Sequence, residues 1–286
     1  LLLISDLNLN QQESDELDKE IKSLKDSGFD ITLQLLDHHI TGKVSAAKYD
    51  WYFLDDKRCA TKIVFDYLLK EFKAPLNDYK EWVDTVNAVD IWLENEKENF
   101  EFGKVLMSMV TKAREINSIL FNSLDRDFKF YLLKNSIGFL SLKDAPIVLD
   151  NSVHSLKKEF LKDGFDDTLD NLSASYLVKS LDKIKDDLTI YYNGQKGLMT
   201  YCLGAISIPA NSFLRANSDY DFFIDVGRKG NASFRADGKL DVSQLASKLA
   251  NGGGHVNASG GKFDDFKEVI DFYEVKTYIQ KKLDKI

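Results

Sequence analysis

The 286-residue sequence has few of the residues that mark disulfide-bonded or membrane proteins. Its two cysteines, Cys59 and Cys202, lie far apart, which excludes a dense disulfide framework and fits a reducing compartment. No stretch approaches the roughly 20 apolar residues that a membrane span requires. Only three prolines and a hydrophobic fraction of 44% fit ordinary globular folding, over about two domains at this length. We therefore expect a cytoplasmic protein without a membrane partner.

The sequence also lacks an excess of positive charge, because its formal net charge at pH 7 is −8. Proteins that hold long duplexes gain most of their non-specific affinity by neutralising phosphates with basic side chains. The negative charge therefore argues against a long nucleic-acid duplex as a partner. It favours a short or small phosphorylated substrate, near which bound metal ions supply positive charge locally.

Histidine is scarce, with four residues in the chain, yet His38 and His39 are adjacent. They follow Asp37 and the apolar run Leu33–Leu36, which has the length of a buried strand in a parallel sheet. Ligands of open α/β sheets bind beyond the carboxyl ends of the strands, and histidine with aspartate can bind zinc, manganese or iron. The pattern predicts a metal site, although an exposed loop with two surface histidines would have the same sequence.

The residues before this motif predict a strand–helix–strand unit. Leu1–Ser5 is expected to form a strand that ends at Asp6, and a helix at Glu13–Asp26 leads to the strand Ile31–Leu36. Two parallel strands joined by a right-handed crossover end at the same edge of their sheet. Asp6 and Asp37 should therefore lie near each other.

The rest of the chain predicts helices first and short strands later. A helix is expected from Cys59 to Phe72, followed by mostly helical segments as far as residue 185. Beyond residue 187 the pattern changes to two hairpins, at 188–203 and 222–236, with a helix after each and a further strand near residue 260. The chain should thus contain an N-terminal parallel sheet and a C-terminal sheet of short strands.

Two motifs carry a resemblance to a known family. The Asp-His-His sequence at 37–39 resembles the motif that names the DHH phosphoesterases, and the Gly-Gly-Gly-His sequence at 252–255 resembles the signature of the DHHA1 domain that accompanies them. The tripeptide alone is a weak signal, but the pair in this order is a strong one. The resemblance covers most of the chain and is nearest to the nano-RNase (oligoribonuclease) branch, which includes pAp phosphatases and relatives that cleave cyclic dinucleotides.

The resemblance implies an α/β fold in two domains. Residues 1–150 would form the parallel-sheet DHH domain that holds metal, residues 151–186 a helical connector, and residues 187–286 a smaller α/β DHHA1 domain that binds substrate. The active site would be the cleft between the domains. A homodimer is compatible with this arrangement.

The resemblance also implies a site for two Mn²⁺ ions, with Mg²⁺ or another divalent ion as an alternative. Asp37, His38 and His39 would be the catalytic residues. Asp6 would bridge the two ions, His38 would bind one of them, and His39 would contact the substrate phosphate or a metal. Asp37 would accept a histidine proton and fix the tautomer of that ring.

A further metal ligand is expected between Trp82 and Trp92. Asp90 resembles the family's ligand in its Asp-x-Trp context and in its distance from the Asp-His-His motif, so the predicted metal ligands are Asp6, His38 and Asp90. Asp84 is the alternative, and the sequence does not decide between the two acids.

Substrate-binding residues are expected mainly in the C-terminal part. Arg235 resembles a family arginine that holds the terminal phosphate or base of the substrate, and a guanidinium suits bidentate phosphate contacts. A loop of glycines allows close backbone approach to a phosphate. The residues assigned to substrate binding are His39, Arg235, Gly252, Gly253, Gly254 and His255.

The implied activity is Mn²⁺-dependent hydrolysis of short oligonucleotides to mononucleotides, with pAp as an additional substrate. A cyclic-dinucleotide phosphodiesterase, or a nucleotide-binding regulatory protein with an incomplete metal site, stays open as an alternative. The family's first motif, His-x-x-x-Asp-x-Asp, does not occur in the sequence. We expect it to precede Leu1, because an unpaired hydrophobic strand at a chain start would promote aggregation.

Overall fold

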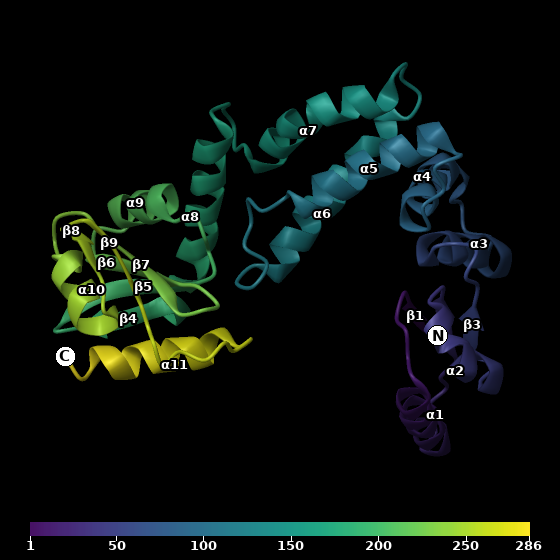
Figure 1. Ribbon diagram of the computed structural model, residues 1–286, viewed down its shortest axis with the longest axis horizontal. Helices are drawn as coiled ribbons and strands as arrows, with labels where there is room; N and C mark the ends of the chain where they lie inside the picture. The colour runs from purple at the N-terminus through teal and green to yellow at the C-terminus, as the bar shows by residue number, and fades with distance from the viewer. The chain divides into compact units, whose positions relative to one another are not determined.

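The computed structural model describes all 286 residues and contains a parallel and a mixed β-sheet (Figure 1). The chain divides into an N-terminal unit, Leu1–Thr111 with Leu133–Ser152, and a C-terminal unit, Lys112–Leu132 with Val153–Ile286. The α/β class is therefore confirmed, while the domain boundaries at residues 150 and 186 remain a prediction. Most of the expected connector groups with the C-terminal unit. None of the helices combines the length and apolar character that crossing a bilayer requires.

The N-terminal unit contains a three-stranded parallel sheet whose middle strand leads to the Asp-His-His motif. Leu35 and Leu36 of that strand are buried, as expected for the centre of a parallel sheet. The parallel pairing of the first two strands confirms the strand–helix–strand prediction. In spatial order the strands are β1 (Leu2–Ser5), β2 (Leu33–Asp37) and β3 (Tyr52–Leu54).

The helix between β1 and β2 begins with a capping box. In α1 (Gln11–Asp26), Asn10 Oδ1 accepts the N–H of Glu13 at 3.0 Å, and Glu13 Oε2 accepts the N–H of Asn10 at 2.9 Å. Gly28, just past the helix, has φ +91°, which lets the chain turn into β2. The helix expected at Glu13–Asp26 is therefore confirmed, with a start two residues earlier.

Helices make up the rest of the N-terminal unit. The helix predicted from Cys59 to Phe72 is confirmed, with Cys59 as its N-cap. Two further helices, α6 and α7, contain residues of both units. The helices are α2 (Lys43–Lys48), α3 (Ala60–Phe72), α4 (Lys80–Asp90), α5 (Lys97–Thr111), α6 (Asn122–Ser136) and α7 (Ala145–Leu161), with short 3₁₀ turns at 40–42, 77–79 and 137–139.

The C-terminal unit contains a six-stranded mixed sheet. All neighbouring strands are antiparallel except β5 and β6, and both predicted hairpins are confirmed. The first hairpin turns at Asn193 and Gly194, which both have positive φ. In spatial order the strands are β4 (Thr189–Tyr192), β5 (Gln195–Tyr201), β6 (Phe222–Val226), β7 (Asn231–Ala236), β9 (Ala258–Lys262) and β8 (Gly253–His255).

Helices cover both faces of this sheet (Figure 1). On one face, side chains of α10 (Val242–Ala250) and α11 (Phe272–Leu283) form a buried core with alternate residues of the strands. On the other face lie α8 (Leu169–Leu188) and α9 (Ser207–Ala216). This arrangement decides which strand residues remain available for binding.

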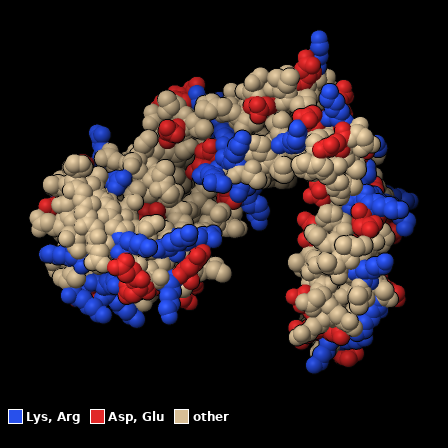
Figure 2. Space-filling view, in the orientation of Figure 1, with Lys and Arg blue, Asp and Glu red and all other residues tan.

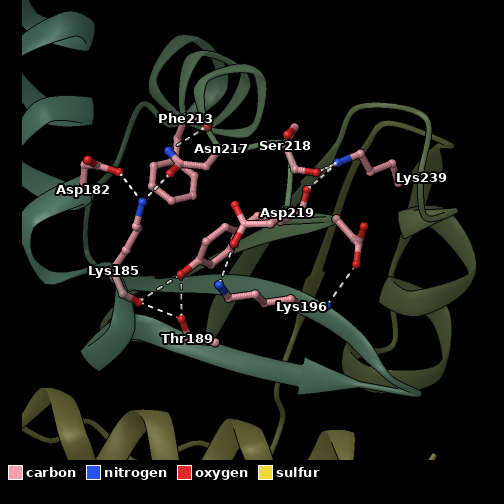
Figure 3. Close-up of polar contacts among 11 residues, drawn as sticks. Asp182, Lys185, Thr189, Lys196, Phe213, Asn217, Ser218, Asp219 and Lys239 are labelled. Carbon is pink, nitrogen blue, oxygen red and sulfur yellow. Dashed lines mark hydrogen bonds and ion pairs between the residues drawn. The ribbon is translucent and has the colours of Figure 1, made fainter.

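A polar network fixes the segment that follows α9 (Figure 3). Lys185 of α8 donates to Asn217 at 2.7 Å, and Lys196 of β5 pairs with Asp219 at 2.7 Å. Lys239, beyond β7, donates to the backbone carbonyl oxygen of Ser218. Three lysines from different elements therefore hold the chain at the carboxyl end of α9, which stabilises the position of this helix over the sheet.

Candidate metal centre and substrate-binding residues

The carboxyl ends of β1 and β2 place the N-terminal candidate residues at one edge of the parallel sheet. Asp6 follows β1 directly, and its N–H donates to the carbonyl oxygen of Leu36 on β2 at 3.1 Å. Asp6 has φ +56°, a left-handed conformation that aspartate tolerates better than most residues. This conformation ends the strand and leaves the carboxylate at the sheet edge beside the Asp-His-His motif.

Asp6, His38 and His39 form a group whose possible ligand atoms all lie within 4.8 Å of one another. Nε2 of His38 is 3.3 Å from Oδ1 of Asp6 and 3.7 Å from Oδ2 of Asp90. The His38 side chain is 16% exposed, whereas Asp6 and Asp90 are 63% and 46% exposed. Two accessible carboxylates thus converge on one nitrogen of a largely covered imidazole.

Helix α4 carries Asp90 at its last residue, and a buried hydrogen bond ties this helix to α3. Oδ1 of Asn87, one turn before Asp90, accepts the N–H of Cys59 at 2.8 Å. Residues three positions apart lie on the same side of a helix. The hydrogen bond of Asn87 therefore fixes the rotation of α4 about its axis, and with it the direction in which Asp90 points toward His38.

Asp84, the alternative ligand, is engaged elsewhere. Its carboxylate pairs with Lys62 of α3 and, at 3.3 Å, with Lys80. Burial raises the pKa of Asp84, but the hydrogen bonds and charges of the two lysines outweigh this effect and leave the pKa below its ordinary value. The geometry therefore favours Asp90 as the ligand and a structural role for Asp84.

The aspartate of the motif is fully buried and hydrogen-bonded on both oxygens. Oδ1 of Asp37 lies 2.7 Å from Nδ1 of His39, and Oδ2 accepts the hydroxyl of Tyr52 at 2.9 Å. Burial raises the pKa of Asp37, yet these two hydrogen bonds and those from the backbone N–H groups of His38 and His39 bring it below its ordinary value. Asp37 is therefore an ionised acceptor that contacts His39 from inside the protein.

His39 is placed by Asp37 and faces the acidic group. The hydrogen bond to Asp37 raises the pKa of His39, the charges of Asp37, Asp6 and Asp90 act in the same direction, and burial opposes them. With Nδ1 directed to Asp37, Nε2 is the nitrogen that remains for a metal or a phosphate. The structure thus brings together all five residues predicted for the N-terminal site: Asp6, Asp37, His38, His39 and Asp90.

The donor set fits a divalent cation. Carboxylate oxygens are ligands for Mn²⁺, Mg²⁺ and Zn²⁺, imidazole nitrogen adds a ligand that suits Zn²⁺ and other transition metals, and a cation would relieve the repulsion between Asp6 and Asp90. The residues that would hold it are Asp6, His38 and Asp90, with His39 beside them. Their roles as ligands remain predictions.

We expect the two aspartates of α4 to differ sharply when each is replaced by asparagine. Asp90→Asn should weaken Mn²⁺ binding about tenfold or more, because it removes a charged ligand; a change of partners around a ligand alone costs about 10–100-fold. Asp84→Asn is the matched control on the same helix and should leave the dissociation constant within about twofold. Calorimetric titration with Mn²⁺ measures both, and a larger loss in the Asp84 variant would reverse the assignment.

In the C-terminal unit, Arg235 and His255 face the same side of the sheet. Alternate residues of β7 point into the core under α10 and α11, so Arg235 points to the face of α9. Arg235 is opposite Ala258 on β9, and Ala258 is opposite His255 on β8, so the three share one face. Nη2 of Arg235 donates to Oγ of Ser207, the first residue of α9, at 2.9 Å. The structure therefore brings Arg235 and His255 together on one face.

The prediction of a loop at the glycine run is wrong, because Gly253–His255 forms the edge strand β8 on β9. A Cβ atom on Gly252 would lie 2.0 Å from the carbonyl oxygen of Gly260, and Gly254 has φ +147°. Close packing against β9 is thus sufficient to require glycine at these two positions. Gly253 meets no such obstacle, and its β8 edge is exposed. A substrate-binding role for the run remains a prediction.

Sequence reasoning missed two residues of these sites, Tyr52 and Ser207. Tyr52 lies on a three-residue strand, which is too short to show a periodic pattern. Ser207 begins α9 without a side-chain capping bond, so no cap pattern marks it. For Tyr52 the residue type was the one available signal of a role in the site, since a buried tyrosine hydroxyl usually has a polar partner.

Comparison with known proteins identifies close relatives. A 3',5'-cyclic-nucleotide phosphodiesterase of Helicobacter pylori (strain ATCC 700392 / 26695) is 42% identical over 285 residues, which cover 98% of this chain and 82% of the relative. The crystal structure of an uncharacterized protein from Helicobacter pylori G27 is also 42% identical and aligns with a TM-score of 0.80 over 99% of this chain and 82% of that chain.

Two other comparisons do not identify the family of this chain. No family model matches the chain. RecJ of Thermus thermophilus, in complex with Mg²⁺, aligns with a TM-score of 0.27 at 13% identity over 99% of this chain and 49% of that chain, a similarity too low to carry an argument. The 42% identity over nearly the whole chain is decisive: this chain belongs to the phosphodiesterase family that includes the Helicobacter pylori 3',5'-cyclic-nucleotide phosphodiesterase.

Proposed function

We propose that this protein is a metal-dependent phosphodiesterase that hydrolyses 3',5'-phosphodiester bonds in small nucleotides, with 3',5'-cyclic nucleotides as its first candidate substrate. The observation that supports this most strongly is the convergence of Asp6 and Asp90 on Nε2 of His38. It occurs in a chain that is 42% identical to a 3',5'-cyclic-nucleotide phosphodiesterase.

In the proposed reaction the chain's own residues bind the cation and orient the His39 ring toward the phosphate. Asp6, His38 and Asp90 would hold the cation, for which we propose Mn²⁺, because carboxylates suit this ion and it is also bound by sites that mix nitrogen and oxygen ligands. When bound, divalent cations stabilise negative charge on phosphoryl oxygens and activate water. His39 keeps a proton at Nδ1 toward Asp37 and presents Nε2 to the phosphate. Asp37, which is buried, keeps this ring in place.

A second candidate substrate is a short oligonucleotide, cleaved to mononucleotides, with pAp as a related small substrate. Arg235 favours it, because a cyclic mononucleotide has a single phosphate and leaves no second phosphate for a remote guanidinium. Residues 187–286 contain 13 Lys and Arg against 12 Asp and Glu, a net charge of +1, whereas residues 1–186 contain 25 against 34, a net charge of −9. Figure 2 shows basic side chains, with acidic ones among them, in the region of α11 in the C-terminal unit. The negative charge of residues 1–186 thus favours binding of a cation. Residues 187–286 are nearly neutral and repel a phosphorylated substrate less.

We expect removal of divalent metal to abolish activity. The purified protein should hydrolyse 3',5'-cyclic AMP or GMP in the presence of Mn²⁺, and a chelator should reduce the rate by about a hundredfold or more, because the charge on the phosphoryl oxygens would lose several kcal/mol of stabilisation. Anion-exchange chromatography of the products measures this, with 2',3'-cyclic AMP as a control of similar charge.

The same assay with a linear dinucleotide, a cyclic dinucleotide and pAp ranks the candidate substrates. The highest kcat/KM on the linear dinucleotide would favour the second candidate. Activity that persists in the chelator would contradict metal dependence. Tight binding of these nucleotides without hydrolysis at saturating Mn²⁺ would favour a regulatory nucleotide-binding protein instead.

A further inference from the structure

A buried tyrosine contacts the aspartate of the Asp-His-His motif from the neighbouring strand. Tyr52 on β3 is 3% exposed, and its hydroxyl donates to Oδ2 of Asp37 at 2.9 Å. The other oxygen of that carboxylate lies 2.7 Å from Nδ1 of His39. Tyr52, Asp37 and His39 therefore form a continuous hydrogen-bonded chain that runs from the core to the accessible edge of the site.

We propose that Tyr52 is a positioning residue: it holds the Asp37 carboxylate in one orientation, and Asp37 in turn fixes the ring position and tautomer of His39. The catalytic part of this inference rests on the proposed function, in which His39 contacts the phosphate or the metal. The structural part, the control of His39 by Tyr52, does not.

The orientation of Asp37 needs such a partner because a carboxylate rotates easily about its last bond. Backbone N–H groups of His38 and His39 and the His39 ring all approach from the carboxyl end of β2. Tyr52 is the one side chain that holds the carboxylate from β3. Since an ionised carboxylate only accepts hydrogen bonds, His39 must carry its proton on Nδ1, which leaves Nε2 for the site.

The space around the tyrosine hydroxyl is closely fitted. A Cβ atom on Gly42 would lie 2.2 Å from the hydroxyl oxygen and 2.9 Å from the ring carbon that carries it. Gly42 has φ −75°, a conformation open to any residue, so glycine is needed here for space. The N–H of Leu9 also points to the hydroxyl oxygen, at 3.4 Å. The hydroxyl thus has one enclosed position, from which it donates to Asp37.

Tyr52 is also suited to remain a donor. Burial, and next the hydrogen bond to Asp37, raise the pKa of Tyr52 to about 12. The hydroxyl therefore keeps its proton throughout the range in which the protein would work.

The test compares Tyr52→Phe with Tyr49→Phe. Tyr49 is the matched control, since its hydroxyl also donates to a carboxylate, Oδ1 of Asp15 at 2.5 Å, but that carboxylate does not contact His39. Long-range ¹H–¹⁵N spectra of the metal-free protein at alkaline pH report the tautomer of each imidazole. Because the chain has only four histidines, a His39→Gln variant is sufficient to assign the His39 signals.

We expect His39 to be in the Nδ1–H form in the wild type and in Tyr49→Phe. Tyr52→Phe should contain a clearly increased Nε2–H fraction, and kcat with saturating Mn²⁺ should fall about 10–100-fold, the usual effect of removing an outer partner of a metal-site residue. Thermal unfolding checks that each variant is folded. An unchanged His39 spectrum in folded Tyr52→Phe would overturn the inference, as would an Nε2–H form in the wild type.

A second variant covers the case in which Tyr52→Phe does not fold. Gly42→Ala keeps the tyrosine but displaces its hydroxyl, so it should produce the same change in the His39 spectrum; a wild-type spectrum in Gly42→Ala would overturn the inference. If the wild type hydrolyses no phosphodiester, the proposed function fails, while the spectra of the metal-free protein still decide whether Tyr52 controls His39.

Discussion

Replacing Asp6 by asparagine should reduce metal-dependent phosphodiester hydrolysis by about a thousandfold or more, which corresponds to ~4 kcal/mol of transition-state stabilisation. The reason is that Asp6 contributes a carboxylate to the group in which it lies 3.3 Å from Nε2 of His38. Without this charge the proposed cation loses a ligand, and a bound cation supplies several kcal/mol to phosphoryl chemistry. His38→Ala should have a loss of similar size.

Asparagine is the informative substitution at this position. Asp6 has φ +56°, and asparagine accepts this left-handed conformation, whereas alanine would add backbone strain of about 1–2 kcal/mol. The side chain is 63% exposed, so the fold should remain intact. Asp144 offers a matched control, because it is an exposed aspartate with the same φ of +56° outside the metal group.

The measurement is kcat/KM with saturating Mn²⁺ for Asp6→Asn, Asp144→Asn and the wild type, together with thermal unfolding of each. Asp144→Asn should retain wild-type activity. If Asp6→Asn keeps more than a tenth of the wild-type turnover, Asp6 is not a ligand of the catalytic metal and the assignment of the site fails.

The edge of the parallel sheet could be predicted from sequence because strand direction alone determines it. Asp6 follows β1, Asp37 is the last residue of β2, and parallel neighbours end at the same edge. The choice between Asp84 and Asp90 could not be made from helix geometry, since both lie on α4, about 120° apart around its axis. It depends on Lys62, a residue of another helix, which pairs with Asp84.

In the C-terminal part, the wrong loop prediction and the missed contact of Arg235 with Ser207 also result from tertiary contacts that the sequence does not show. A glycine run contains no local signal that separates a loop from an edge strand, and the strand β8 exists only because β9 is there to pair with it. Likewise, the contact of Arg235 with Ser207 joins β7 to α9, which the sequence does not place together. Local pattern predicted the elements, and tertiary pairing determined which of their residues meet.

Arg235→Ala should separate binding of the remote part of the substrate from the chemistry at the phosphate. On a short oligonucleotide with a second phosphate, kcat/KM should fall about ten- to a hundredfold, because a hydrogen-bonded charged partner contributes roughly 1.5–3 kcal/mol. On a minimal phosphodiester such as bis(p-nitrophenyl) phosphate the loss should be small. Mn²⁺ affinity should not change, since Arg235 belongs to the C-terminal unit and the proposed ligands to the N-terminal unit.

The structure supplies the controls for this experiment. Arg228 lies in the turn between β6 and β7 and pairs with Glu268 at 3.5 Å, so Arg228→Ala removes an equal charge from the same hairpin without affecting the face of Arg235 and His255. Arg235→Lys retains the charge but cannot reproduce the forked contacts of a guanidinium, which now reach Oγ of Ser207 and the carbonyl oxygen of Phe234. If the forked geometry serves the substrate, the lysine variant should recover only part of the lost kcat/KM. Equal losses on both substrates would instead assign Arg235 to folding or to the reacting centre, and no loss on either would make it an ordinary surface residue of β7.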